Sequence, residues 1–411
     1  MMVLSFYSAG FDLGPVSAKV YVAVLLFSFT AILALMRGTG IIQLSWGRKI
    51  FFLWAALIIW KIIAKTANGF GFFNTVHGLL KNDIIAMFTF LALIYFIRTR
   101  KELKFIVSSL IFLTLLSAFV GVMQWLDFSW AWDLQQNLNP HPDRDLIEMN
   151  QNELIRGLAA TTVAFGYYLA TIFPLMIPQI FQQRQRFFKV SSIIFLLVSL
   201  FLLQQRSAVL AAFLCSFMLM YGAQRYMKRR FRTLIFVALI LLGGSYVIYQ
   251  LADATLSEYG RYDMYRINRF TDPQRIEMAK IAIEQALKNP FFGTPRMAIV
   301  GRDGFMQRVA PHNLFLNTFL YYGIFGLALT CFMLAVFFRF GIRVWRAAWA
   351  TGDFISIGLV LGLTGYTVNS MFHNASFVTG DYLFWWVAAL LVASEQIRET
   401  EKVMTEDEHA R

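Results

Sequence analysis

Seven arginines gather in one polar interval of an otherwise apolar sequence, between residues 251 and 310. A guanidinium group binds phosphate oxygens through paired, planar hydrogen bonds and keeps its charge at any physiological pH. The flanking segments are apolar enough to span a membrane. The interval therefore predicts a site for an anionic ligand carried on a lipid. The seven are Arg261, Arg266, Arg269, Arg275, Arg296, Arg302 and Arg308.

Arg275 lies just inside a predicted helix. Asp272 is suited to cap a helix and Pro273 to occupy its first position, and an Asn-Pro pair after residue 288 stops the run. A cation in the first turn opposes the helix dipole, so Arg275 requires an anionic partner. That partner is either a bound phosphate or the carboxylate of Asp272 or Glu277.

The same helix carries an apolar stripe, which predicts that it packs against the top of the helical bundle or against the membrane surface. The stripe consists of Ile276, Ala279, Ile283 and Leu287.

Arg206 and His312 are two further candidates. Arg206 lies where two apolar runs meet, and it is either a site residue or an anchor that reaches to the membrane boundary. His312 follows Pro311 and precedes a helix expected to start at Asn313. Its imidazole can accept a proton from an attacking hydroxyl near neutral pH, and the alternative is a hydrogen-bonded histidine at the interface.

Nothing in the sequence predicts a metal or a nucleotide cofactor. No pair of histidines or carboxylates has metal-ligand spacing, and no glycine-rich nucleotide loop follows a strand. Cys215 and Cys331 both lie in apolar runs and are interpreted as small core residues.

Composition places the whole chain in a membrane. Of its 411 residues, 58% are hydrophobic and 15% are charged, which excludes a soluble globular domain. Recurring apolar runs predict an all-α polytopic membrane protein with about eleven spans, or twelve with a short one inside the first seventeen residues. The runs lie near residues 16–36, 50–64, 83–97, 103–126, 154–181, 187–203, 207–223, 234–249, 313–338, 354–372 and 382–393.

Lysine and arginine fill every second connection, so these loops are predicted to be cytoplasmic by the positive-inside rule. Most of the formal charge of +13 is then an orientation signal, and nucleic-acid binding loses its support. The external face receives the segment 127–153, the turn 204–206, the loop 251–310 and the turn around His373. We expect these segments to assemble one site.

The sequence divides into four parts on this basis. Residues 1–250 hold the N-terminal transmembrane helices, and residues 251–310 form one large external loop containing amphipathic helices. Residues 311–396 hold the C-terminal transmembrane helices, and residues 397–411 form a cytoplasmic tail of mixed charge. No feature indicates an oligomeric state.

Several stretches, taken together, resemble the O-antigen ligase superfamily. Residues 275–282 read RIEMAKIA, and residues 205–208 (QRSA) are similar to an Arg-Ser-Ala stretch that opens a helix in that family. The other matching stretches are 289–293 (NPFFG), 311–316 (PHNLFL) and 322–327 (YGIFGL), and all together cover about a quarter of the chain. One departure is visible, because the family commonly continues with glycine after NPFFG, whereas Thr294 and Pro295 follow here.

The resemblance implies a GT-C-like helical fold and a glycosyltransferase of the bacterial inner membrane, active in lipopolysaccharide biosynthesis. Such an enzyme transfers a finished O-antigen from undecaprenyl diphosphate to a sugar hydroxyl of lipid A-core. The reaction takes place on the periplasmic face, inverts the sugar and needs neither nucleotide nor metal.

Three residues match functional positions of that family. The resemblance implies that Arg206 and Arg275 stabilise the diphosphate, and that His312 orients or deprotonates the acceptor. The remaining loop arginines would hold acidic groups of core sugars or lipid A. The substrate-binding set is Arg261, Arg266, Arg269, Arg296, Arg302, Arg308 and Asn313.

Three other activities stay open. An O-antigen polymerase uses the same donor but tends to have a second large basic loop, whereas the segment 127–153 here is short and acidic. A protein O-oligosaccharyltransferase of the superfamily is usually longer. A lipid or polysaccharide transporter would place ionisable residues at mid-membrane, where Lys61 and Arg156 are the few candidates and both can reach a boundary.

Overall fold

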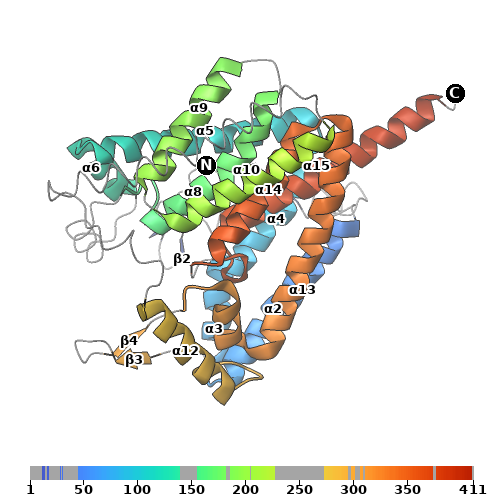
Figure 1. The fold of residues 1–411 in the computed structure, drawn as a ribbon. Coiled ribbons are helices and arrows are strands. Elements are labelled where there is room, and N and C mark those ends of the chain that lie inside the picture. Colours follow the sequence, from blue (N-terminus) through green and yellow to red (C-terminus); the bar gives the residue numbers. More distant parts are fainter. Residues whose placement is uncertain are drawn as a thin grey trace.

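A computed structural model describes residues 12–13, 16–17, 28, 30, 45–138, 155–181, 186–203, 205–226, 273–294, 298–300, 306–308, 311–373 and 376–409. Helices make up nearly all of this part, and the chain is an all-α polytopic membrane protein, as predicted (Figure 1). Two short antiparallel pairs, which the sequence did not predict, are β1 (Asp12–Leu13) with β2 (Val16–Ser17) and β3 (Ala298–Val300) with β4 (Met306–Arg308).

The helical elements of the described part extend from α2 to α15. In chain order they are α2 (Ser45–Ala67), α3 (Phe72–Leu79), the π-helical turn η1 (Leu80–Ile84), α4 (Ile85–Phe96), α5 (Arg100–Trp125), α6 (Ser129–Leu138), α8 (Thr162–Met176), η2 (Ile177–Phe181), α9 (Arg186–Leu202), α10 (Arg206–Tyr226), α12 (Pro273–Lys288), α13 (Leu314–Thr351), α14 (Phe354–Ser370), η5 (Phe377–Thr379) and α15 (Tyr382–His409).

Five helices of the described part are long and apolar enough to cross a membrane, or six if the bent pair formed by α3 and α4 counts as one span. They include α8 continued by η2, and two shorter apolar helices lie at 187–202 and 354–370. The predicted spans at 16–36 and 234–249 fall largely or wholly outside the described residues. The segment 397–409 was predicted as a separate tail, and in the structure it continues α15.

The predicted span 154–181 begins later than expected, because residues 155–160 form a turn docked on α5. Gln124 accepts hydrogen bonds from the backbone N–H groups of Arg156 and Gly157, both at 2.9 Å. Gly157 adopts a φ of +57°, and a Cβ there would overlap the Ser117 carbonyl. Side-chain hydrogen bonds from α5 thus replace the first helical turns.

Small residues bring α14 into direct backbone contact with α8. Gly358, Gly362 and Gly365 repeat along one face of α14, and each lies against a backbone carbonyl of α8. Close packing of this kind holds transmembrane helices together, because lipid provides no hydrophobic driving force between them. Since α10 also packs on both helices, α8, α10 and α14 form a rigid unit.

A buried ion pair joins α2 to the π-helical turn. Lys61 is fully buried, and its Nζ lies 2.5 Å from a carboxylate oxygen of Asp83 and also donates to the Val378 carbonyl. The sequence offered Lys61 as a candidate for an ionisable residue at mid-membrane, and the structure places its side chain inside the bundle, in an ion pair. The pair ties α2, η1 and η5 together inside the bundle.

Removing one member of this pair is expected to destabilise the protein strongly. Asp83→Ala leaves the Lys61 charge buried without its carboxylate, and the expected loss is about 3 kcal/mol. The paired replacement Lys61→Met with Asp83→Leu removes both charges and should recover most of that loss. Thermal unfolding in detergent measures both effects, and a single variant as stable as the paired one would contradict this account.

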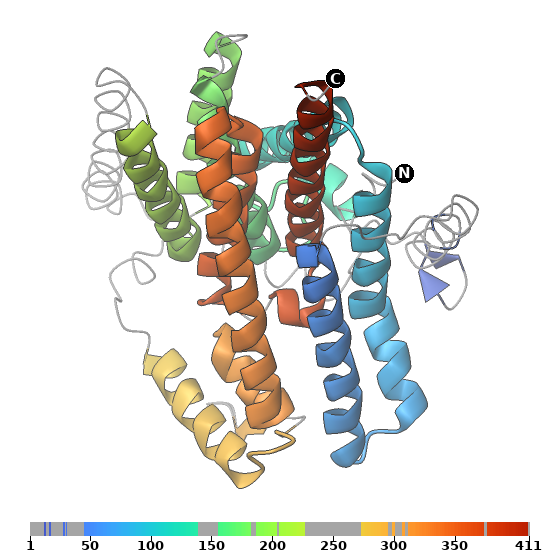
Figure 2. The same cartoon turned by 90° about the vertical axis from the view of Figure 1, so that its right-hand side faces the viewer.

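Positive charge gathers at one end of the bundle. Arg100 at the start of α5 pairs with Asp353, which caps α14, and with Glu401 of α15. Arg343 of α13 pairs with Glu399 of α15 at 2.5 Å. Figure 2 shows this end opposite to α12 and to the turn between α2 and α3. The two ends of the bundle therefore differ in chemistry.

Candidate functional site

Three segments that are far apart in the sequence meet where α10 and α13 begin and α14 ends. The Ser207 hydroxyl lies 2.8 Å from Nε2 of His373, and the Gln205 amide contacts the same nitrogen. The Asn313 side chain donates to the Met371 carbonyl at 3.0 Å. The segments 205–207, 311–313 and 371–373 thus form one cluster, which we call the rim cluster. Two of the candidate residues, Arg206 and His312, belong to it.

Two contacts of His373 involve the same nitrogen of its ring. The Ser207 hydroxyl and the Gln205 amide both contact Nε2, so one ring nitrogen is shared by the residues on either side of Arg206. The side chain is buried, and the Tyr167 ring of α8 lies 5.9 Å from it. His373 therefore holds the residues on both sides of Arg206.

The Gln205 side chain also depends on a close approach to α8. It lies over Gly166, where any Cβ would overlap its amide. The glycine therefore leaves room for the contact between Gln205 and His373.

A half-buried carboxyl, that of Asp381, lies in the turn before α15. Burial raises the pKa of Asp381 to about 6, although the Leu383 N–H and the Tyr366 side chain oppose this shift. The Leu383 N–H donates to the carboxylate at 2.9 Å. A carboxyl that titrates near neutral pH is typical of functional sites as well as of buried polar networks.

His312 is held in an unusual backbone conformation by the start of α13. Its φ is +41°, and the next residue, Asn313, caps the helix by accepting from the N–H groups of Phe315 and Leu316. A non-glycine residue in this region is uncommon, and such residues concentrate at functional sites. The prediction that a helix begins at this point is confirmed, with Leu314 as its first residue. Asn313 has a capping role that the sequence did not predict.

Arg206 is the first residue of α10, and it is exposed. A cation in the first turn is opposed by the helix dipole, whereas an anion at that place is favoured by the dipole and by free backbone N–H groups. An anionic group bound beside Arg206 would satisfy both the guanidinium and the helix end.

Arg275 occupies the third position of α12, which runs from Pro273 to Lys288, so the predicted helix is confirmed. The prediction gave its apolar stripe two possible partners, the bundle and the membrane surface, and most of the stripe does not pack on the bundle. Ala282 and Ala286 are buried against Leu320 of α13, whereas Ile283 and Leu287 are exposed. Small side chains make the helix contact because they allow a close approach, and the larger ones are left for the membrane surface.

The far end of α12 is locked into a break in α13. Gly323 interrupts the helix with a φ of +67°, and the Ile324 N–H donates to the Pro290 carbonyl at 2.7 Å. The Thr294 N–H donates to the Leu320 carbonyl at 2.5 Å. We call this contact between residues 289–294 and the break at Gly323 the interlock. It gives a structural role to residues 289–293 and 322–327, two stretches that the sequence analysis identified only by their resemblance to a family.

Asn68, after α2, extends the interlock to the N-terminal helices. It accepts from the Asn289 side chain at 3.0 Å and donates to the Phe292 carbonyl at 3.4 Å. In Figures 1 and 2, α12 extends away from this anchored end, and its first turn lies at about the level at which α13 begins. Arg275 thus lies in the first turn of a helix that is anchored at its opposite end.

The remaining predicted substrate-binding arginines lie outside the part of the chain whose side chains are described. Arg308 belongs to β4, and Arg261, Arg266, Arg269, Arg296 and Arg302 fall in segments without described structure. Their roles stay predictions. The same holds for the side chain of Arg275.

His373, Gln205 and Ser207 are members of the cluster that sequence reasoning did not select. The sequence placed the turn around His373 on the same face as residues 204–206, which was the available signal. It offered no reason to choose His373 over other histidines, because that choice depends on the packing of α10 beside α14.

One family model matches the chain, over residues 191–331, and its description is O-antigen ligase. The match runs from α9 into α13 and includes Arg206, α12, the residues of the interlock and His312. His373 lies beyond it. No curated protein matches this sequence.

Proposed function

We propose that this chain, which matches the O-antigen ligase family model over residues 191–331, is a ligase that moves O-antigen from undecaprenyl diphosphate onto lipid A-core. The superfamily comprises multi-pass membrane proteins that act as ligases or polymerases of lipid-linked polysaccharide. The observation that best supports our proposal is the rim cluster, in which the chain neighbours of Arg206 and of His312 contact the same turn, residues 371–373.

The proposed reaction requires no chemistry beyond these side chains. His312 takes the proton of an acceptor sugar hydroxyl, whose oxygen attacks the anomeric carbon of the donor from the side opposite the diphosphate. The bond from that carbon to the diphosphate oxygen breaks, and the lipid diphosphate leaves with the electron pair. Arg206 and Arg275 stabilise its growing negative charge, and the sugar is inverted.

His312 is a better base than His373 in this scheme. Nε2 of His373 is already in contact with Ser207 and Gln205, so a reaction at this nitrogen would first break these contacts. His312 belongs to the rim cluster and is half-buried.

The site faces the periplasm in this proposal, and the membrane is the bacterial inner membrane. The basic end of the bundle supports this orientation, because arginines such as Arg343 and Arg398 favour the cytoplasmic side. Since α14 starts beside Arg100 and ends at the rim cluster, the two lie at opposite ends of one helix.

Deletion of the gene distinguishes ligation from polymerisation, the nearest alternative. For a ligase, we expect full-length polymer stranded on the lipid carrier together with bare lipid A-core. Capping of lipid A-core with a single repeat would instead identify a polymerase. Transfer by the purified protein is expected to continue in the presence of a chelator, and its loss would contradict the metal-independent mechanism.

A further inference from the structure

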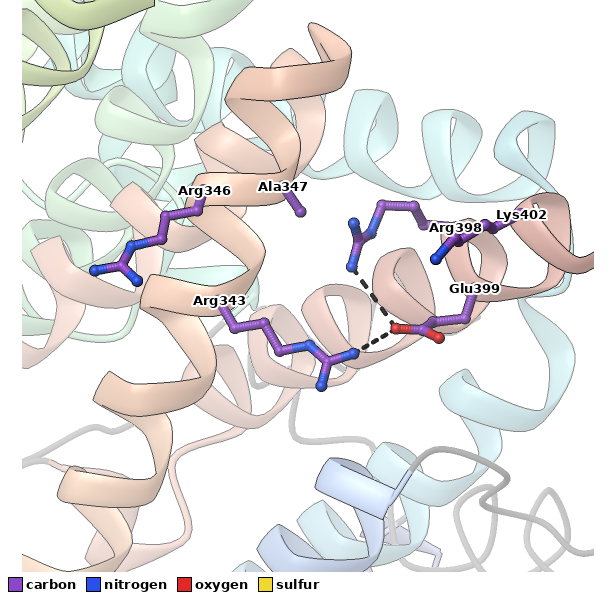
Figure 3. Close-up of a pocket in the computed structure, with 6 residues that line it drawn as sticks. All are labelled: Arg343, Arg346, Ala347, Arg398, Glu399 and Lys402. Atoms are coloured by element: carbon purple, nitrogen blue, oxygen red, sulfur yellow. Dashed lines mark hydrogen bonds and ion pairs between the residues drawn. The ribbon is translucent and has the colours of Figure 1, made fainter.

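A cavity of about 570 Å³ opens between α13 and α15 at the basic end of the bundle. It is lined by Arg343, Arg346, Ala347, Arg398, Glu399 and Lys402 (Figure 3). We call it the cation pocket. It lies at the opposite end of α14 from the rim cluster, so the proposed transfer does not account for it.

Carboxylates neutralise only part of its charge. Arg343 and Arg398 share Glu395, which is fully buried below the pocket, and both lie near Glu399. The charges of these two arginines and two glutamates cancel. In Figure 3, dashed lines mark the contacts of Arg343 and Arg398 with Glu399.

Arg346 supplies the excess positive charge, and Lys402 adds a second cation whose exposed partner is Glu406. Arg346 has no ion pair with any described carboxylate, and Figure 3 shows its guanidinium turned away from Glu399. Lys402 has a contact of 3.6 Å with Glu406 on the exposed side of α15. The side chains lining the pocket therefore have room and positive charge for an anionic group.

We propose that the cation pocket binds the phosphodiester headgroup of an anionic glycerophospholipid. Guanidinium groups recognise phosphate oxygens through paired hydrogen bonds, and basic pockets between transmembrane helices bind anionic headgroups. Phe332 and Phe338 are exposed earlier on α13, so acyl chains can lie along the same helix. The bound lipid would bridge α13 and α15, the helices that carry the break at Gly323 and the turn of Asp381.

The test uses the full-length protein in detergent, titrated with phosphatidylglycerol or with phosphatidylcholine and followed by thermal unfolding and native mass spectrometry. Phosphatidylglycerol is expected to remain bound and to raise the unfolding midpoint, whereas phosphatidylcholine is not. The double variant Arg346→Gln with Lys402→Gln should bind phosphatidylglycerol about ten-fold or more weakly. Both positions are exposed and neither contacts Glu395, so the fold should be retained.

Arg339→Gln serves as the matched control, because it removes an exposed arginine of α13 outside the pocket and should leave lipid binding unchanged. Equal binding of the two lipids, or equal binding by the double variant and the original chain, would overturn the proposal. An equal rise in the unfolding midpoint with inorganic phosphate alone would also overturn it, since the site would then recognise free phosphate. None of these measurements depends on glycan transfer.

Discussion

Arg206→Ala is expected to lower the rate of glycan transfer at least about 100-fold, while the protein remains folded. The guanidinium is exposed at the start of α10, so its loss opens no cavity in the core but removes a donor to the leaving diphosphate. Arg206→Lys keeps the charge without the planar fork and should retain about a tenth of the activity. The measurement is the initial rate with a lipid-linked donor and purified acceptor, at protein amounts matched by gel filtration.

Arg339→Ala is the control for this prediction, since it removes an exposed arginine far along α13. A transfer rate unchanged in Arg206→Ala would remove this residue from the mechanism.

The effect of His373 on transfer is expected to pass through Arg206. His373→Ala should slow transfer on its own but add little to Arg206→Ala, because both changes affect the same group.

The sequence was sufficient to predict the structure where the signal was local. The bounds of α12 follow from Pro273 at its start and from the Asn-Pro pair after its end, and the structure places the helix between them. The membrane class follows from composition, which does not depend on how the helices pack. The start of α13 likewise follows from a local signal, the apolar run that begins after His312.

Sequence reasoning was insufficient where packing decides. Gly323 lies inside an apolar run that predicts a continuous helix, and only its contact with residues 289–294 explains the break. The ion pair between Lys61 and Asp83 could not be predicted from the sequence. The two residues lie on different elements, α2 and η1, and only packing brings them together. The roles of His373 and Gln205 depend in the same way on the close packing of α8, α10 and α14.

Gly323→Ala is expected to release α12 and to reduce transfer by about ten-fold to 100-fold. Gly323 has a φ of +67°, which a residue with a Cβ rarely adopts, and the added methyl group would overlap the Phe291 carbonyl. The Ile324 N–H then loses the Pro290 carbonyl, and the interlock opens. Hydrogen exchange should show faster exchange in residues 289–294 and in α12.

Gly341→Ala is the matched control, because it adds a methyl group to the same helix at an ordinary contact distance of 3.7 Å from Val360. Asn289→Ala tests the same idea without backbone strain, since it removes only the hydrogen bond to Asn68 and should give a smaller effect in the same direction. Full activity of Gly323→Ala with α12 still protected would show that the added methyl group does not open the interlock, against the expected result. If exchange increases but transfer is unchanged, α12 is free to move without affecting the reaction, and Arg275 would then have no part in the transition state.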